Sequence, residues 1–302
     1  MKPLPAVPMP LSLRDLRAAR AHQAGARQRL EDAIAEYHGA RAAFGTSSAR
    51  AALWLALNVL HQLRPERDRV ILPGYTCPTV GRSVTEAGLL GLCADVELDT
   101  LNIDPAEVSA LIDGRVLAVV APHMFGVPCG VAALRTLCDE HGAWLIEDLA
   151  QCVGGRWQGR PVGTFGDIGF LSMGRSKNLR GCEGGLLWVN RDDLVGPLRA
   201  AFDALPEAPD GARGRWRQTA IAVLSEPRLW AVAKRLPGGR VGAEDQSFDP
   251  HPAKLGDWEA GVGLISLERL EEYNQRRREQ AARLRGLLED VPGLRCQRVP
   301  RE

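Results

Sequence analysis

The feature that most constrains the fold is a series of short, nearly continuous apolar runs separated by turns and helical stretches. The runs are at 70–72, 92–96, 116–121, 144–146, 168–171 and 186–189. Helical patterns lie between several of them, as at 105–112 and 130–141. Strands buried on both faces give continuous apolar segments, and parallel strands are joined through helices. The pattern predicts an α/β fold with a mostly parallel central sheet flanked by helices.

The character of the chain changes near residue 195, and a chain of 302 residues is long for a single core. Residues 1–200 are expected to form the large α/β domain, including an N-terminal helix over 12–38. Residues 201–253 read as a helical and loop insert. Its amphipathic helix at 215–236, which bears Trp and Arg, could lie on a membrane surface, but packing on protein is the expectation. Residues 254–302 carry a long helical pattern from about 255 to 289.

Composition excludes several classes of function. The 38 basic residues are balanced by 37 acidic ones, which gives no electrostatic case for binding nucleic acid. The seven cysteines are scattered without a CxxC pair, so neither a disulfide framework nor a zinc site is expected. The Pro-rich N-terminus lacks the apolar core of a signal peptide, and no apolar stretch is long enough to span a membrane. A cytoplasmic protein is expected.

The segment from 144 to 185 carries the residue types that pyridoxal phosphate requires. Asp148 ends one apolar run, and Ser172 ends a later run and is followed by Lys177. This cofactor needs a lysine amine to bond to, a carboxylate for its ring nitrogen, and hydroxyl or N–H groups for its phosphate. Taken singly, Lys177 reads as a solvated charge and Asp148 as a turn residue at a strand end. Together they fit the cofactor.

Ordered motifs extend this pattern over most of residues 25 to 290. They are SARAAL at 48–53, LPGYTCPTV at 72–80, ADVELDTLNID at 94–104, PHMFG at 122–126, IEDLAQCVGG at 146–155, GTFGDIGFLS at 163–172 and SKNLRGCEGG at 176–185. In this order and spacing, the chain resembles the DegT/DnrJ/StrS group of nucleotide-sugar aminotransferases. The resemblance implies the aspartate-aminotransferase-like fold of the fold-type I pyridoxal-phosphate enzymes.

The resemblance also implies roles for individual residues. Lys177 would hold pyridoxal phosphate and then move a proton between substrate and cofactor, and Asp148 would keep the pyridine nitrogen protonated. Gln151 matches the position that contacts the hydroxyl side of the ring. Ser172 would bind the phosphate together with the turn at Ala49, Arg50 and Ala51, where a helix begins.

Other positions are ambiguous or depart from the family pattern. The family's ring-stacking aromatic residue aligns with Cys77, and Tyr75 is the candidate to replace it. His123 reads equally well as a catalytic or a structural residue, whereas Glu183 reads as part of a turn. The family's Asn-x-Arg-like element is not found between 200 and 256, and the small C-terminal domain looks incomplete at residue 302.

The resulting prediction is a pyridoxal-phosphate-dependent aminotransferase. It would transfer an amino group from glutamate or glutamine to a nucleotide-linked keto-sugar by a ping-pong mechanism. The resemblance implies a homodimer and a role in surface polysaccharide or secondary-metabolite sugar synthesis. Two alternatives stay open. One is a non-catalytic, aminotransferase-like binding or regulatory protein. The other is a pyridoxal-phosphate-dependent sugar dehydratase, against which Lys177 argues, because that group has His at this position.

Overall fold

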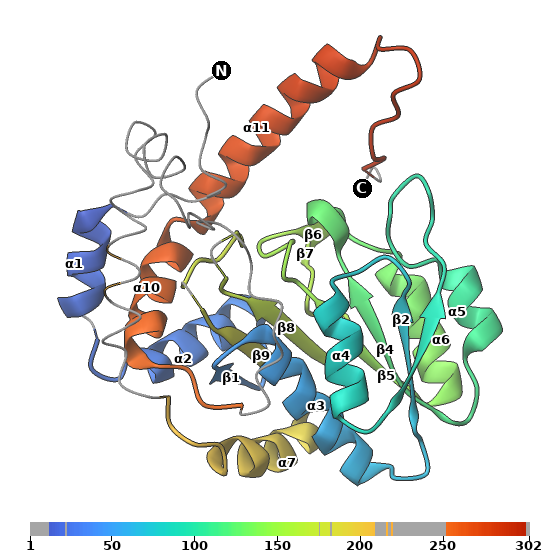
Figure 1. Ribbon diagram of the computed structural model, residues 1–302, viewed down its shortest axis with the longest axis horizontal. Coiled ribbons are helices and arrows are strands. Elements are labelled where there is room, and N and C mark those ends of the chain that lie inside the picture. Colours follow the sequence, from blue (N-terminus) through green and yellow to red (C-terminus); the bar gives the residue numbers. More distant parts are fainter. Residues whose placement is uncertain are drawn as a thin grey trace, which may run out of the picture.

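The computed structural model describes residues 12–21, 23–174, 176–181, 183–208, 216, 219 and 252–299. A seven-stranded sheet with the order β1-β9-β8-β5-β4-β2-β3 runs through this part of the chain (Figure 1). Strands β3, β2, β4, β5 and β8 are parallel, whereas β9 is antiparallel to both of its neighbours. The predicted α/β fold with a mostly parallel sheet is confirmed.

The six predicted apolar runs all form strands of this sheet. The strands are β1 (Ala42–Thr46), β2 (Arg69–Pro73), β3 (Leu90–Ala94), β4 (Val116–Pro122), β5 (Trp144–Asp148), β8 (Ile168–Ser172) and β9 (Gly185–Val189). A separate small hairpin pairs β6 (Arg156–Trp157) with β7 (Arg160–Pro161). Strand β1 is the member of the sheet that the apolar runs did not predict.

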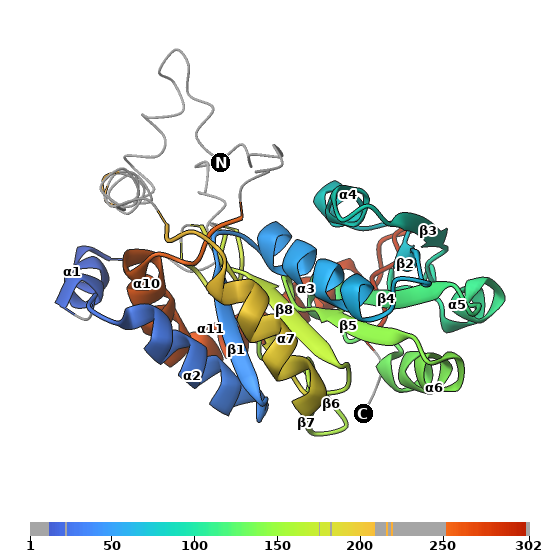
Figure 2. The same ribbon diagram turned by 90° about the horizontal axis from the view of Figure 1, so that it is seen from below.

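Helices cover both faces of the sheet (Figure 2). On one face, the apolar core includes α3 (Ala49–Leu63), α4 (Pro78–Glu86) and α7 (Asp192–Asp203). On the other face lie α2 (Ala26–His38), α5 (Pro105–Leu111), α6 (Val131–His141) and α10 (Asp257–Glu268). Because both faces are buried, the central strands must be apolar on both sides.

Two predicted long helices are each divided in the structure. The expected helix over 12–38 is in fact α1 (Leu13–Ala21) followed by α2, with Gly25 in the left-handed conformation (φ 63°) just before α2. The pattern over 255–289 divides at Arg269 into α10 and α11 (Leu270–Leu288). The predicted helix at 215–236 lies outside the described residues except for Trp216 and Thr219.

The outer edge of β1 is closed by segments from elsewhere in the chain. The carbonyl oxygen of Gly45 accepts a hydrogen bond from Leu255 N (2.8 Å), and its N–H donates to the buried carboxylate of Glu31 on α2 (2.8 Å). Ser47 N donates to Ala253 O (2.8 Å). Unpaired strand edges promote aggregation, and these contacts cover the carboxyl end of β1.

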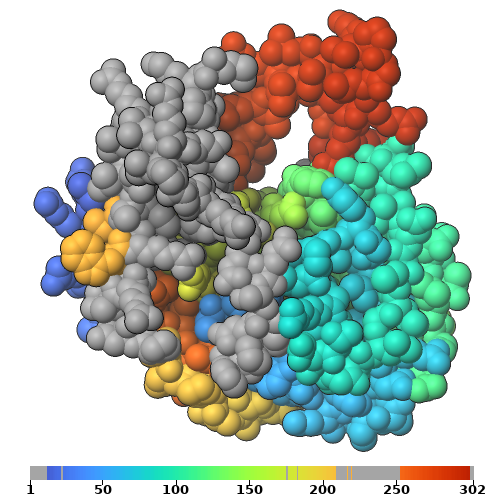
Figure 3. Space-filling view, viewed as in Figure 1, coloured from blue at the N-terminus to red at the C-terminus, as the bar shows by residue number. Residues whose placement is uncertain are grey.

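Helix α11 is packed on the protein only at its beginning, where Leu270, Tyr273 and Asn274 are buried. Beyond this point most residues are exposed, and the helix projects from the body of the molecule (Figure 1). The segment after it returns to the body, where Arg298 N donates to Asp99 O (2.7 Å). In the space-filling view, α11 and the segment after it form an arch over an open space (Figure 3).

No helix in the described part of the chain is long and apolar enough to cross a membrane.

The strand arrangement gathers several segments at one edge of the sheet. The carboxyl ends of the five parallel strands meet there, and so does the end of β1, because Thr46 and Ser172 both pair with Gly185 across β9. Helix α3 starts just after β1, so its amino terminus lies at the same edge. Ligands of open α/β sheets bind at this edge.

Candidate active site

Asp148 and Lys177, which the sequence singled out, line the same small pocket at the carboxyl edge of the sheet. The pocket's lining residues are Thr76, Cys77, Pro122, His123, Met124, Asp148, Ala150, Gln151 and Lys177. Its volume is about 20 Å³. The chemistry of the lining combines a carboxylate, an amine and an amide.

Asp148 is nearly buried at the end of β5, with 7% of its surface exposed. Its Oδ1 accepts a hydrogen bond from Ala150 N (2.8 Å). Burial raises the pKa of Asp148, and the Ala150 hydrogen bond and the nearby Lys177 and His123 side chains only partly oppose this effect. A protonated ring nitrogen at the pocket would stabilise the ionised carboxylate.

Lys177 lies in the loop between β8 and β9, where its N–H donates to Gly174 O (3.0 Å). Gly174 separates the lysine stem from the hydroxyl of Ser172. A Cβ at this glycine would lie 3.5 Å from both Lys177 Cγ and Ser172 Oγ. The serine hydroxyl therefore lies next to the lysine, at the end of β8.

Helix α3 begins beside β9. Ser48 is its N-cap and accepts a hydrogen bond from Ala51 N through Oγ (3.1 Å). The first N–H groups of any helix have no carbonyl partner within the helix, and they point out from its amino terminus. A Cβ on Gly185 would lie 2.4 Å from Ala49 N, so only glycine permits this approach. Gly185 is also the partner of Ser172, which places the helix start one strand away from that hydroxyl. Helix N-termini of this kind bind phosphate.

The side chain of Gln151 stabilises an unusual backbone conformation at Phe125. Its Oε1 accepts a hydrogen bond from Phe125 N (3.0 Å), and Phe125 has left-handed backbone angles (φ 56°, ψ 24°). Because the oxygen is engaged by this N–H, the amide nitrogen of Gln151 is the group left to donate elsewhere. Strained residues persist where neighbouring contacts hold them, and they cluster at binding sites.

The structure separates Cys77 and Tyr75. Cys77 lines the pocket as the N-cap of α4, with its Sγ 3.1 Å from Thr79 Oγ1. Tyr75 is half exposed outside the lining, where its ring pairs with that of Phe125 at 6.3 Å between centroids. The substitution of Tyr75 for the missing aromatic residue stays a prediction. Its present position is at the rim.

Sequence reasoning did not assign a role to Glu147, which is entirely buried and lies 3.0 Å from His123. Its other partners come from a loop sixteen to nineteen residues later, so no local spacing indicated them. Glu183 is exposed next to Gly184 (φ 121°), as expected for a turn residue. Among the described residues, no cluster of His, Cys, Asp and Glu could hold a metal ion.

An acid, a lysine and a helix N-terminus meet at the carboxyl edge of a parallel sheet, which is the edge where enzymes of the α/β class bind their ligands. The chain belongs to the DegT/DnrJ/EryC1/StrS aminotransferase family, whose model matches residues 15–302.

Several known proteins are similar to this chain. The spore coat polysaccharide biosynthesis protein SpsC of Bacillus subtilis (strain 168) is 29% identical over 267 residues, which are 88% of this chain and 62% of the relative. The L-glutamine:2-deoxy-scyllo-inosose aminotransferase of Streptomyces fradiae is 31% identical over 273 residues, which are 89% of this chain and 58% of the relative. A dTDP-4-dehydro-2,6-dideoxy-D-glucose 3-dehydratase of Saccharopolyspora spinosa is 29% identical over 277 residues, which are 89% of this chain and 58% of the relative. The chain thus spans about three fifths of the length of these relatives.

Among solved structures, DesI in the presence of its TDP-sugar product is 28% identical, with a TM-score of 0.72. The match covers 97% of this chain and 68% of DesI. The fold is therefore shared along nearly the whole chain.

Proposed function

We propose that the chain is a pyridoxal-phosphate-dependent aminotransferase that moves an amino group from glutamate or glutamine to a nucleotide-linked keto-sugar. The observation that carries the proposal is the meeting of Asp148 and Lys177 in one pocket at the carboxyl edge of the sheet. Pyridoxal phosphate, once bound, supplies a ring that withdraws electrons from the substrate carbon. The residues of the pocket fit its functional groups.

The two principal residues have complementary tasks. The amine of Lys177 would hold the cofactor through its aldehyde carbon and would be released when the amine of the donor takes its place. Once free, the same amine moves a proton between substrate and cofactor, as a general base and then an acid. The carboxylate of Asp148 keeps the ring nitrogen protonated through a charge-assisted hydrogen bond, worth about 1.5–3 kcal/mol.

The remaining residues orient the cofactor. The N–H groups at the start of α3 and the hydroxyl of Ser172 bind the phosphate, and Arg50 adds a positive charge close to the helix start. The amide nitrogen of Gln151 donates toward the ring hydroxyl, since its oxygen is held by Phe125. These groups would contact different parts of the cofactor, its phosphate and its ring hydroxyl, and would thereby fix the position of the reacting carbon relative to Lys177.

The reaction proceeds in two halves. The donor leaves as a keto acid before the keto-sugar enters and takes up the amine, which is ping-pong chemistry. The name of SpsC and the TDP-sugar bound to DesI support a nucleotide-linked sugar and a role in polysaccharide or secondary-metabolite synthesis. The inosose aminotransferase relatives favour glutamine as donor and make a free keto-cyclitol the second candidate acceptor.

Absorbance of the purified chain with pyridoxal phosphate, before and after borohydride reduction, tests the proposal. We expect a visible band that reduction fixes onto the peptide containing Lys177, and that glutamate or glutamine bleaches before reduction. The Lys177→Arg variant should lose the band. Lys254→Arg is the matched control, because Lys254 pairs with Glu207 (3.0 Å) away from the pocket lining.

Other outcomes would decide against the proposal. Absence of the band, or a label on another lysine, would favour a non-catalytic, aminotransferase-like protein. If the cofactor binds, offering a TDP-linked keto-sugar and 2-deoxy-scyllo-inosose in parallel separates the two acceptors. Loss of a hydroxyl without gain of nitrogen in the product would identify a dehydratase.

A further inference from the structure

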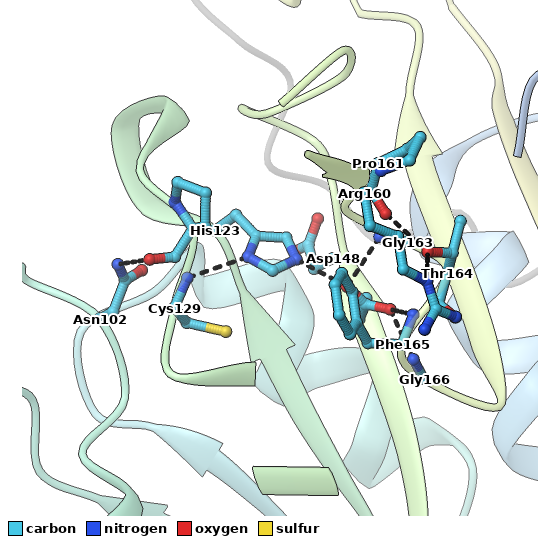
Figure 4. Close-up of polar contacts among 12 residues, drawn as sticks. Asn102, His123, Cys129, Asp148, Arg160, Pro161, Gly163, Thr164, Phe165 and Gly166 are labelled. Atoms are coloured by element: carbon cyan, nitrogen blue, oxygen red, sulfur yellow. Dashed lines mark hydrogen bonds and ion pairs between the residues drawn. The ribbon is translucent and has the colours of Figure 1, made fainter. Parts of the chain in front are cut away.

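Glu147 has an environment opposite to that of its neighbour Asp148. Its side chain is fully buried, and its carboxylate accepts four hydrogen bonds from within the protein. The donors are His123 Nε2 (3.0 Å), Gly163 N (2.7 Å), Phe165 N (2.8 Å) and Gly166 N (2.6 Å), some of which are visible in Figure 4. Burial disfavours the charge, but these bonds hold the pKa of Glu147 below its ordinary value.

The hydrogen bonds of His123 determine where its ring carries a proton. Nδ1 accepts a hydrogen bond from Cys129 N (3.1 Å), so this nitrogen must present a lone pair. Nε2 faces Glu147, whose other three partners are all backbone N–H donors, so this nitrogen must carry the proton. A second ring proton would point at the N–H of Cys129 inside the protein. Burial lowers the pKa of His123, whereas Cys129 and the Glu147 carboxylate raise it well above its ordinary value. The Cys129 N–H opposes the charged form, because it occupies the direction in which a second ring proton would point. On this geometry the ring is neutral and protonated on Nε2.

His123 connects this buried network to the cofactor pocket. Its backbone N–H donates to Asp148 O (3.1 Å), and His123 is one of the residues that line the pocket, although its side chain is fully buried. A positively charged ring at this position would compete with a cationic ligand for the Asp148 carboxylate. A neutral ring leaves that carboxylate to the ligand.

We propose that Glu147 is a positioning residue, which together with the Cys129 N–H fixes His123 as a neutral ring protonated on Nε2. Asp148 is thereby reserved for the protonated ring nitrogen of the cofactor. The identity of that cation rests on the proposed function. The state of His123 is a property of the chain itself, so it can be measured without any cofactor.

Nitrogen-15 NMR of the histidine-labelled, cofactor-free chain near neutral pH tests the inference directly. We expect the His123 signals of a neutral ring with hydrogen on Nε2. Signals of a doubly protonated ring, or of hydrogen on Nδ1 alone, would overturn the proposal whether or not the cofactor binds. A failure of the proposed function is thus distinguishable from a failure of this inference.

The variant Glu147→Gln supplies the second measurement. Whichever way the amide is turned, its NH₂ group faces buried N–H donors. We therefore expect an altered His123 spectrum and pyridoxal phosphate binding weakened about tenfold or more, as when an orienting partner is removed from a ligand-binding group. Binding is read by equilibrium titration. Unchanged affinity and an unchanged spectrum in the folded variant would refute the positioning role.

Glu31→Gln is the matched control. Glu31 is also buried (2% exposed) and accepts a backbone N–H bond, from Gly45, but it lies on α2 at the edge of the sheet. We expect this variant to lose stability while its cofactor affinity and His123 spectrum stay as in the parent. Should Glu147→Gln not fold, the spectrum of the parent chain decides the matter alone.

Discussion

The two adjacent acids Glu147 and Asp148 show how neighbours in sequence acquire different roles. The carboxylate of Glu147 accepts four hydrogen bonds from the protein, whereas the carboxylate of Asp148 accepts one, from the backbone N–H of Ala150. Environments that push two carboxyl groups apart in pKa commonly separate a structural acid from a functional one. The sequence places both at a strand end, but only the contacts distinguish them.

Replacement of Asp148 by Asn tests the functional acid. The amide keeps an oxygen for the Ala150 N–H but removes the charge, so we expect cofactor affinity to fall about tenfold to hundredfold. Titration followed by tryptophan fluorescence measures this change. Asp167→Asn is the control, because Asp167 binds Arg135 and Leu145 N at the opposite end of β5. Equal losses of affinity in both variants would contradict the assignment.

His38 makes the fold sensitive to acid. Burial lowers the pKa of His38 from 6.5 to about 4, and the ring stacks on Trp188 at 4.0 Å between centroids. Below pH 6.5 the unfolded chain takes up a proton that the folded chain accepts only near pH 4. Protonation of His38 therefore leaves the free energy of unfolding unchanged above pH 6.5. As the pH falls from 6.5 toward 4, it lowers this free energy by about 3 kcal/mol.

Urea unfolding at a series of pH values measures this effect. The variant His38→Phe keeps an aromatic ring against Trp188 but cannot be protonated. Its free energy of unfolding should fall less between pH 6.5 and 4 than that of the parent chain. Parallel curves for the two proteins over this range would show that His38 is not the responsible group.

At the scale of the elements, Gly185 governs the contact between β9 and α3. A Cβ there would lie 2.4 Å from Ala49 N, which is backbone and cannot turn aside. We expect Gly185→Ala to destabilise the chain by about 1–3 kcal/mol and to weaken phosphate binding at the helix start. Gly196→Ala in α7 is the control, since nothing lies within 4 Å of its added Cβ, and it should stabilise by about 0.5–1 kcal/mol.

The outer part of α11 should be the least protected helix segment. Isolated helices of this length are marginal in water, and most residues after Asn274 are exposed. We expect backbone amides of 276–288 to exchange with deuterium much faster than those of α3, which is buried against the sheet. Hydrogen exchange with mass spectrometry measures both. Similar protection of the two helices would mean that another surface covers α11.

Most strands and several helices could be predicted because burial on both faces leaves a continuous apolar pattern. Strand β1 could not, since its sequence AAFGT has weak strand propensity and pairs with β9, far along the chain. The divisions at Gly25 and Arg269 depend on packing that a helical pattern does not reveal. Similarly, Asp148 and Lys177 belonged to known motifs, whereas the partners of Glu147 come from a loop that only folding brings near.

At the scale of the whole molecule, the proposed homodimer is testable. Tyr75 and Phe125 are 50% and 54% exposed at the rim of the pocket, and exposed aromatic surface of this kind is enriched at interfaces. Light scattering after size-exclusion chromatography should give twice the chain mass of 32.8 kDa. Changing Tyr75 to Glu should shift the protein toward the monomer. A parent chain that remains monomeric at micromolar concentration would exclude the dimer.

The loop between β8 and β9 carries Lys177, and the pairing of Ser172 with Gly185 closes this loop at its base. The hydroxyl of Ser172, Lys177 and Gly185, the glycine that admits α3, thus belong to one hairpin with a single register. A slip of one residue would turn Ser172 to the opposite face and shift the lysine by about 3.3 Å. Insertions at the tip of the loop change only the reach of the lysine, whereas insertions at its base dismantle the site.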